Sequence, residues 1–200
     1  MVGNDVVDLF DPAVVAGPRH PRFDARVFAP SEHRALRESA EPNPLRWAFW
    51  AAKEAAYKVA KKLDAAAVWS PLRFVVCFER GLEGAVEYNG LRIPVQVERD
   101  EQRVHALATD QVESLARLRS CVARLEDPDA ADASAAVRLL AREQLAPLLS
   151  ARPDQLEITR RDRIPVLRMA GCDAPFDLSL SHHGRFVAFA AEPLCERSPR

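Results

Sequence analysis

The chain has 200 residues, of which 48% are hydrophobic and 28% are charged, and its formal net charge is −1. This composition is typical of a globular protein and excludes a disordered chain. The balanced charge argues against non-specific binding of nucleic acid, which needs a basic excess. No apolar run approaches the roughly 20 residues that span a bilayer, and no secretory signal is visible. We therefore expect a cytoplasmic protein that binds neither nucleic acid nor a membrane.

The first half begins with the short β-branched run "VVDLF", which predicts a strand. Residues 11–23 contain three prolines and predict a loop. A helix is expected to begin near Pro30, and a longer one to run from about Leu45 to Leu63, where Ala, Lys and Glu favour helix. Four strand-like runs separated by turn residues follow, namely "LRFVVCFE", "AVEYNG", "LRIPVQVE" and "VHALAT".

The second half has a helical pattern from Gln111 to Ser150, which "EDPDAADAS" interrupts. Two segments typical of strands follow, "LEITRRDRIPVLRM" and "FDLSLSHHGRFVAFAAE". Two short stretches echo the first half. The matched pairs are 91–97 with 162–168, and 103–109 with 185–191. We therefore predict an α+β fold of two similar lobes related by a pseudo-twofold axis, over 1–110 and 128–200, with a helical linker over 111–127.

Four cysteines lie far apart in the chain and form no CxxC or Cys/His ligand spacing. They are Cys77, Cys121, Cys172 and Cys195. Neither structural zinc nor a disulfide framework is expected, and the cysteines are interpreted as small apolar residues in a reducing compartment.

Two carboxylates stand out in "GNDVVDL", where Asp5 and Asp8 lie among apolar residues. Burying such groups is costly unless they are paired or bind a metal. The alternative is that Asp5 caps a turn.

A second cluster is "WAAKEAAYK". The simplest interpretation is a solvated helix face with a Glu54–Lys58 pair, worth only about 0.2–0.5 kcal/mol. The alternative is that Asp5 and Glu54 hold Mg²⁺, which is often bound by one or two carboxylates plus substrate phosphates. Lys53 and Lys58 would then bind phosphate oxygens.

The third cluster is "SLSHHGR". Consecutive histidines on a strand point to opposite faces, so at most one of His182 and His183 enters a given site. A histidine at a strand end is otherwise a hydrogen-bonded turn residue. No GxSxG, GxxxxGK[ST] or GxGxxG motif occurs. Together the three clusters suit transfer of a metal-chelated phosphate.

"GNDVVDL" and "WAAKEAAYK" resemble the paired motifs GxD and (W/F)xxKExxxK of the 4′-phosphopantetheinyl transferases, and "RFDARVFAPSEHRAL" is similar to the segment between them. The resemblance implies a two-lobed enzyme that moves the phosphopantetheine arm of coenzyme A to a serine of an apo acyl or peptidyl carrier protein. The released product is 3′,5′-ADP.

The resemblance implies roles for matching residues. Asp5 and Glu54 match the acids that hold Mg²⁺, and Lys53 and Lys58 match the lysines of the KExxxK motif. Of these, Lys58 is expected to contact phosphate and to assist proton transfer as a catalytic residue. Glu54, or a metal-bound water near it, is the candidate base for the carrier serine. "FDLSLSHHGRFVAFA" resembles the NxSHSxxxV segment of the larger, surfactin-synthetase type, in which Ser and His contact the coenzyme A phosphates. These correspond to Ser181 and His182.

In the larger type this segment precedes GxD, so the two halves of this chain are expected in circularly permuted order, in a monomer with the site between its lobes. The competing arrangement is the small holo-acyl-carrier-protein-synthase type, a trimer of about half this length whose motif order fits without permutation.

Several positions depart from the family pattern. The family has a Gly-Lys-Pro motif whose lysine contacts the coenzyme. This chain has Arg163-Ile164-Pro165 in its place, with Arg163 in a shifted register as the candidate substitute for the lysine. Val7 replaces a second acid, for which Asp8 or water is the candidate substitute. Arg138 and Arg142 are candidates for binding the 3′-phosphate.

Two classes of function remain open. The first is an active Mg²⁺-dependent transferase, and the second is a non-catalytic relative that binds coenzyme A or a carrier protein. The set of Asp5, Glu54 and Lys58 favours the enzyme. A phosphatase or nucleotidyl transferase is disfavoured by the lack of a further acidic cluster.

Overall fold

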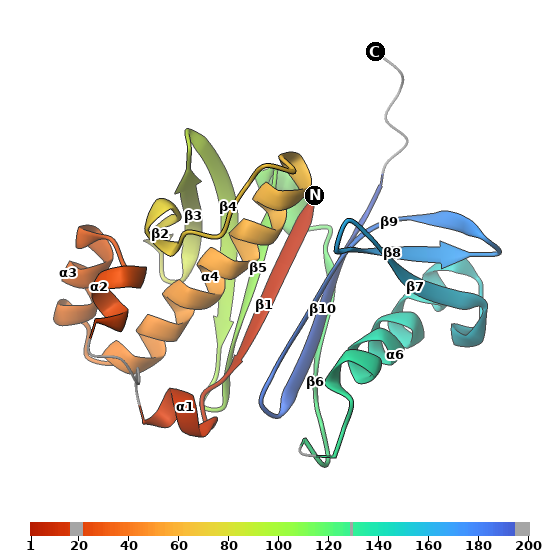
Figure 1. Ribbon diagram of the computed structural model, residues 1–200, viewed down its shortest axis with the longest axis horizontal. Coiled ribbons are helices and arrows are strands. Elements are labelled where there is room, and N and C mark those ends of the chain that lie inside the picture. The colour runs from red at the N-terminus through yellow and green to blue at the C-terminus, as the bar shows by residue number, and fades with distance from the viewer. Residues whose placement is uncertain (17–21, 129, 195–200) are drawn as a thin grey trace.

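A computed structural model describes residues 1–16, 22–128 and 130–194 and shows two lobes, each built on a five-stranded antiparallel sheet (Figure 1). Residues 17–21 of the predicted loop, and the tail from Cys195 onward, lie outside these ranges. No helix within these ranges is long and apolar enough to cross a membrane.

The first lobe contains the strands and helices of residues 1–109. They are β1 (Val2–Asp8), α1 (Pro12–Val15), α2 (Phe23–Val27), α3 (Pro30–Glu38), α4 (Pro42–Leu63), β2 (Val75–Arg80), β3 (Glu83–Tyr88), β4 (Leu91–Arg99) and β5 (Arg103–Thr109). A short 3₁₀ turn, η1 (Pro71–Arg73), precedes β2. The strand order of the sheet is β1-β5-β4-β3-β2.

The second lobe follows the short helix α5 (Val112–Leu115). It contains β6 (Arg119–Arg124), α6 (Ala133–Leu145), η2 (Pro147–Leu149), η3 (Pro153–Gln155), β7 (Leu156–Arg161), β8 (Ile164–Met169), β9 (Cys172–His183) and β10 (Phe186–Pro193). Its strand order is β6-β10-β9-β8-β7.

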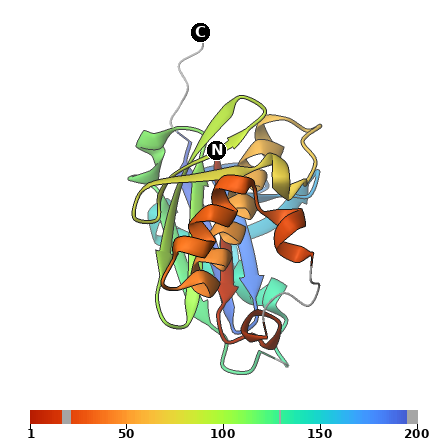
Figure 2. The same ribbon diagram turned by 90° about the vertical axis from the view of Figure 1, so that its left-hand side faces the viewer.

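The two lobes share one topology, in which a first strand is followed by a long helix and then by a four-stranded meander. In both sheets the last strand of the meander pairs with the first strand, and the long helix covers one face (Figures 1 and 2). The predicted α+β fold of two similar lobes is therefore confirmed.

The sequence echo that suggested two lobes does not mark equivalent residues. By sheet order the counterpart of β4 is β9, whereas the echo matched β4 with β8. The echo also matched Ala106 with Ala188, but Ala106 packs in the core beneath α4, and Ala188 faces the other lobe. Because side chains alternate along a strand, a match that is one residue out of register joins opposite faces.

The segment 111–127, predicted as a helical linker, contains a strand. After α5 the chain forms β6, which pairs with β10 from Phe186↔Arg124 to Ala191↔Arg119. The segment therefore supplies an outer strand of the second sheet. The pairing partner lies far along the chain, so local sequence did not indicate it.

Helix α4 begins at Pro42, three residues before the predicted start at Leu45, and ends at Leu63 as predicted. Proline suits the first turn because its missing N–H has no intrahelical partner there. The buried face of α4 is mostly alanine, and it packs on β1, β5 and β4. Small side chains let the helix lie close to the sheet.

Strand β1 is buried on both faces and lies between α4 and the second lobe. Val7 belongs to the core beneath α4, while Val2 and Val6 form small apolar clusters with residues of β10. Odd residues of β1 therefore face α4, and even residues face the second lobe.

Candidate active site

Gly3 allows β1 to lie directly against α4. A Cβ atom at this position would be 2.0 Å from the main-chain oxygen of Ala55, so no other residue fits without moving the helix. Asp5 follows two residues later on the same face of the strand, where it meets Lys58. Lys58 Nζ lies 3.2 Å from Asp5 Oδ1 and donates to the main-chain oxygen of Asn4 at 2.6 Å.

The two carboxylates of this junction affect each other. Burial raises the pKa of Glu54 to about 7, the charge of Asp5 adds to this shift, and Lys58 opposes it. Burial also raises the pKa of Asp5, while Lys58 and His183 act in the opposite direction. Glu54 and Lys58 are therefore not a solvated pair on a helix face, and one cation only partly balances two buried acids.

Asp5 and Glu54 fit the sparse donor set that Mg²⁺ takes when substrate phosphates and waters complete its coordination. A cation here would offset the burial that raises both pKa values, and would also offset the charge of Asp5 that adds to the shift of Glu54. Among the described residues no group of three or more His, Cys, Asp or Glu side chains converges on one point. The protein thus offers two carboxylates, and a metal held by them would depend on a bound phosphate.

Lys53 is not part of this cluster. Its side chain is 0% exposed, and its Nζ lies 2.7 Å from Glu32 Oε2 and donates to the main-chain oxygens of Pro71 and Phe74. Burial lowers the pKa of Lys53, and the charge of Glu32 opposes the shift. The predicted contact between Lys53 and coenzyme A is therefore not available in this structure, because the ammonium is enclosed in the core.

Glu32 explains why this lysine is buried. The Glu32 carboxylate accepts from the main-chain N–H groups of Ala29 and Val76, both at 2.7 Å, and so joins the start of α3 to β2. Lys53 neutralises it. The pair is a structural tie between α3, α4 and β2.

Asp8 is also not free to bind a metal. Arg185 donates to both of its carboxylate oxygens at 2.7 Å, and the main-chain N–H groups of Phe10 and Arg185 donate at 2.9 Å. Burial acts to raise the pKa of Asp8. The hydrogen bonds, chiefly those from the Arg185 side chain, outweigh burial and lower this pKa. Asp8 therefore joins the lobes, and it does not substitute for the acid that Val7 replaces.

Residues of β9 lie across β1 from this cluster. Three β9 side chains cap main-chain N–H groups on the free edge of β1: Val2 donates to Asp177 at 2.5 Å, Asn4 to Ser179 at 3.0 Å and Asp8 to His183 at 3.2 Å. Ser181 belongs to the same series and accepts from the side chain of Asn4 at 3.0 Å. The structure thus brings Ser181 next to the strand that carries Asp5.

His182 points the other way. It is exposed and pairs with Val187, on the face of the second sheet where Leu178 and Phe189 pack near α6. His183 shares the face of Ser181 and acts on Asp5 through its charge. Of the two histidines, His183 is therefore the one that the structure brings to the Asp5 cluster, whereas the family resemblance assigned His182.

A sequence model of the 4′-phosphopantetheinyl transferase superfamily matches residues 1–113, more than half of the chain. The chain belongs to the 4′-phosphopantetheinyl transferase superfamily. No curated protein matches it. The matched residues include β1 and α4, and with them Asp5, Glu54 and Lys58. Ser181 and His182 lie in the second lobe, beyond the match.

The basic residues expected to bind phosphate in this transferase superfamily are dispersed. Arg138 lies on α6 and donates to the main-chain oxygen of Ser134 at 2.6 Å. Arg142, one turn further along α6, has a buried Nε without a protein partner among the described residues. Arg163 occupies the β7–β8 turn with a φ of 70°. Arg138 and Arg142 share with His182 the α6 side of the second sheet, and Arg163 does not join them.

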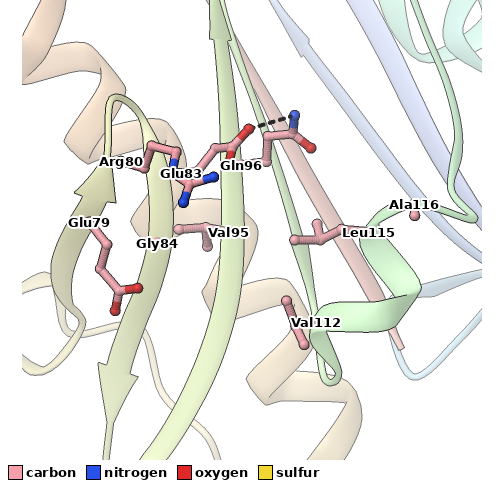
Figure 3. Close-up of a pocket in the computed structure, with 9 residues that line it drawn as sticks. All are labelled: Glu79, Arg80, Glu83, Gly84, Val95, Gln96, Val112, Leu115 and Ala116. Atoms are coloured by element: carbon pink, nitrogen blue, oxygen red, sulfur yellow. Dashed lines mark hydrogen bonds between the residues drawn. The ribbon is translucent and has the colours of Figure 1, made fainter.

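Two grooves among the described residues lie elsewhere. One, of about 500 Å³, is bounded by the β2–β3 hairpin, β4 and α5 (Figure 3). Glu83 and Gln96 point toward each other there, with Gln96 Nε2 3.4 Å from Glu83 Oε1. The other, of about 430 Å³, lies beside β6 and α6. Neither lining includes a predicted site residue, so the junction of β1 and α4 is identified by its chemistry rather than by its depth.

The sequence did not single out the residues that hold the lobes together at the site. Lys62 donates to Val2 O at 2.7 Å, to both oxygens of Asp177 at 2.9 Å and to Leu178 O at 2.8 Å. Its position four residues after Lys58 places it on the same helix face, which was the available signal. Its partner Asp177 carried none, because the contact joins distant parts of the chain.

Proposed function

We propose that this protein transfers the 4′-phosphopantetheine arm of coenzyme A to a serine of an apo acyl or peptidyl carrier protein and releases 3′,5′-ADP. The observation that carries the proposal is the junction at which Gly3 seats β1 on α4 and Asp5 meets Glu54 and Lys58. A carboxylate pair beside one lysine suits a metal-chelated pyrophosphate better than it suits hydrolysis by an enzyme nucleophile.

Mg²⁺ held by Asp5 and Glu54 would neutralise pyrophosphate charge when bound. Lys58 is the cation for the phosphate oxygens, since its side chain is 28% exposed at the junction. Glu54 is the candidate base that takes the proton of the carrier serine. The serine oxygen then forms a bond to the β-phosphorus, and the bond from that phosphorus to the bridging oxygen breaks, which releases 3′,5′-ADP.

Ser181 and His182 are proposed to contact the phosphates of coenzyme A from the second lobe. Ser181 on β9 accepts a hydrogen bond from the side chain of Asn4, the residue that precedes Asp5 on β1. His182 would meet the coenzyme on the α6 side of the sheet, where Arg138 and Arg142 are the nearby basic candidates. Lys53 is left out of this assignment because Glu32 holds it in the core.

A single chain supplies both lobes of this site, and we propose a cytoplasmic monomer in which the halves stand in permuted order. The ammonium of Met1 lies 2.9 Å from Glu192 Oε2, so the start of β1 is beside the end of β10, as such an order requires. The alternative function is a non-catalytic relative that binds coenzyme A or a carrier protein.

The test is intact-protein mass spectrometry of several apo carrier proteins incubated with the purified chain, coenzyme A and Mg²⁺. We expect one carrier to gain the mass of one phosphopantetheine arm. Glu54→Gln and a chelator should abolish the gain, whereas Glu143→Gln, on the exposed side of α6, should not. No gain on any carrier, with coenzyme A still bound, would favour the non-catalytic relative.

A further inference from the structure

Asn4 occupies a position where an apolar residue would be expected. It is 0% exposed and lies between Val2 and Val6 on the face of β1 that meets the second lobe. Both neighbours pack against apolar residues of β10. Its side-chain oxygen Oδ1 is buried without a hydrogen-bond partner among the described residues. A buried amide with an unsatisfied atom destabilises a fold, so packing alone does not account for this residue.

The contacts of Asn4 join the two sides of the site. Its main-chain oxygen accepts from Lys58 Nζ at 2.6 Å, and its main-chain N–H donates to Ser179 Oγ at 3.0 Å. Its side-chain Nδ2 donates to Ser181 Oγ at 3.0 Å and lies 3.4 Å from His105 Nε2. One residue therefore touches the lysine proposed for phosphate and the serine proposed for coenzyme A.

His105 lies beside the side-chain amide of Asn4, with its Nε2 3.4 Å from Nδ2. It is buried beneath Asn4, and burial, followed by the charges of Arg103 and Lys58, lowers its pKa to about 4. The ring is therefore neutral near pH 7, and in the tautomer that leaves Nε2 without a hydrogen this nitrogen accepts from Nδ2 of Asn4. With Nδ2 fixed between His105 and Ser181, Oδ1 is the atom left unpartnered.

The direction of the Asn4–Ser181 hydrogen bond has a chemical consequence. Nδ2 uses an acceptor site of Ser181 Oγ, so the Ser181 hydroxyl hydrogen must point to a different acceptor. Phosphate oxygens are acceptors. Asn4 thus sets the Ser181 hydroxyl as a donor before the coenzyme arrives, which reduces the ordering required on binding.

We propose that Asn4 is a positioning residue for coenzyme A, which orients the Ser181 hydroxyl toward a phosphate oxygen and fixes it relative to Lys58. This inference rests on the proposed function, since it takes coenzyme A as the ligand of Ser181. It concerns the middle residue of the GxD motif, which the motif leaves unspecified.

The test is a double-mutant cycle on coenzyme A affinity, measured by titration calorimetry with the whole chain and Mg²⁺. Loss of one hydrogen bond to a charged group is expected to weaken binding about tenfold in Ser181→Ala and in Asn4→Leu. Leucine fills the volume of the amide and keeps the lobe interface packed. If Asn4 acts through Ser181, Asn4→Leu should weaken binding by less than about twofold when Ser181 is already alanine.

Val2→Ala is the matched control, because Val2 lies on the same strand and face and touches the second lobe without contacting Ser181. Its effect on affinity should be the same with Ser181 or with alanine at that position. Thermal unfolding of each variant separates loss of fold from loss of affinity, and Asn4→Ala replaces Asn4→Leu if the larger residue does not fold.

The outcomes are distinct. Non-additive effects for Asn4 with Ser181, and additive effects for Val2, support the positioning role. Additive effects for Asn4, or unchanged affinity in Asn4→Leu, overturn it while leaving the proposed function intact. A wild-type chain that does not bind coenzyme A would overturn both proposals.

Discussion

The two strand–helix junctions hold the same place in the two lobes, yet their chemistry differs. In the first lobe β1 meets α4 with Asp5, Glu54 and Lys58. In the second lobe α6 packs on its sheet through apolar residues, which include Leu145 of α6 and Phe189 of β10. The comparison shows that the topology alone does not create the site. A close approach permitted by Gly3 and three charged side chains does so in one lobe.

The largest expected effect is a loss of stability on removal of Lys53, the buried lysine of α4 that pairs with Glu32. Lys53→Ala would leave the buried carboxylate of Glu32 without its cation, and removing one partner of a buried pair costs about 3–5 kcal/mol of unfolding free energy. Chemical denaturation would measure the loss. Lys58→Ala, five residues later, should cost far less stability while lowering coenzyme A affinity. Equal losses of stability would contradict the division of roles along this helix.

The second lobe offers the converse variant. Leu145, the last residue of α6, is 0% exposed, so Leu145→Ala should cost about 2–5 kcal/mol through lost burial and a cavity. Carrier modification per folded molecule should stay at the wild-type rate at a temperature where the variant is folded. A specific loss of transfer in folded Leu145→Ala would show that the apolar junction also takes part in the chemistry.

Glu54→Gln should stabilise the metal-free protein at alkaline pH. The folded pKa of Glu54 is about 7, above its ordinary 4.5, so the folded state binds more protons between these values and the wild type gains stability as pH falls from 7 toward 4.5. Above pH 7 the charged, buried carboxylate of Glu54 destabilises the folded protein by about 3 kcal/mol, since one pKa unit corresponds to about 1.4 kcal/mol. The glutamine variant lacks this pH slope.

Denaturation midpoints at several pH values, in chelator, would test this prediction. Glu143→Gln on α6 is the control, since it removes an exposed carboxylate from the corresponding helix. A Glu54→Gln variant that is no more stable than wild type at pH 8 would contradict the electrostatic account of the junction.

The smallest effect is expected at His182. Because this side chain is exposed, His182→Ala should leave the melting temperature unchanged and weaken coenzyme A binding by about threefold to tenfold, the range of one hydrogen bond. Calorimetry would measure it. His183→Ala should instead lower the melting temperature, because the Asp8 N–H loses its acceptor. The reverse pattern would exchange the roles of the two histidines.

Sequence reasoning found β1 and α4 because periodicity and motif spacing act locally. It found the pair of lobes through an echo that does not match equivalent strands and faces. It assigned Lys53 to coenzyme A because a motif gives the position of a residue along a helix but does not show which side of the helix is buried. Lys53 and Lys58 are five residues apart, which places them about 140° apart around the helix axis, whereas Glu54 and Lys58 share a face. Only the packing of α3 and β2 shows that the Lys53 side is buried.

The strand β6 and the contacts between lobes were beyond the sequence for a different reason. "RSCVAR" fits a helix or a strand, and its pairing with β10 decides between them. Asn4, Lys62 and Asp177 have no motif, since each acts on a residue far along the chain. In the sequence, Asn4 stands at a two-residue spacing between Val2 and Val6, and this polar residue within an apolar series is the local sign that sets one face of β1 apart. The structure shows that Asn4 is buried there.

The most direct test of the central claim is the Mg²⁺ dependence of coenzyme A binding, measured by calorimetry for wild type and Glu54→Gln. The account predicts tighter binding with Mg²⁺ for the wild type and no gain from Mg²⁺ for the variant, with Glu143→Gln behaving as wild type. A gain from Mg²⁺ that persists in Glu54→Gln would contradict the assignment of the junction between β1 and α4 as the metal-phosphate site.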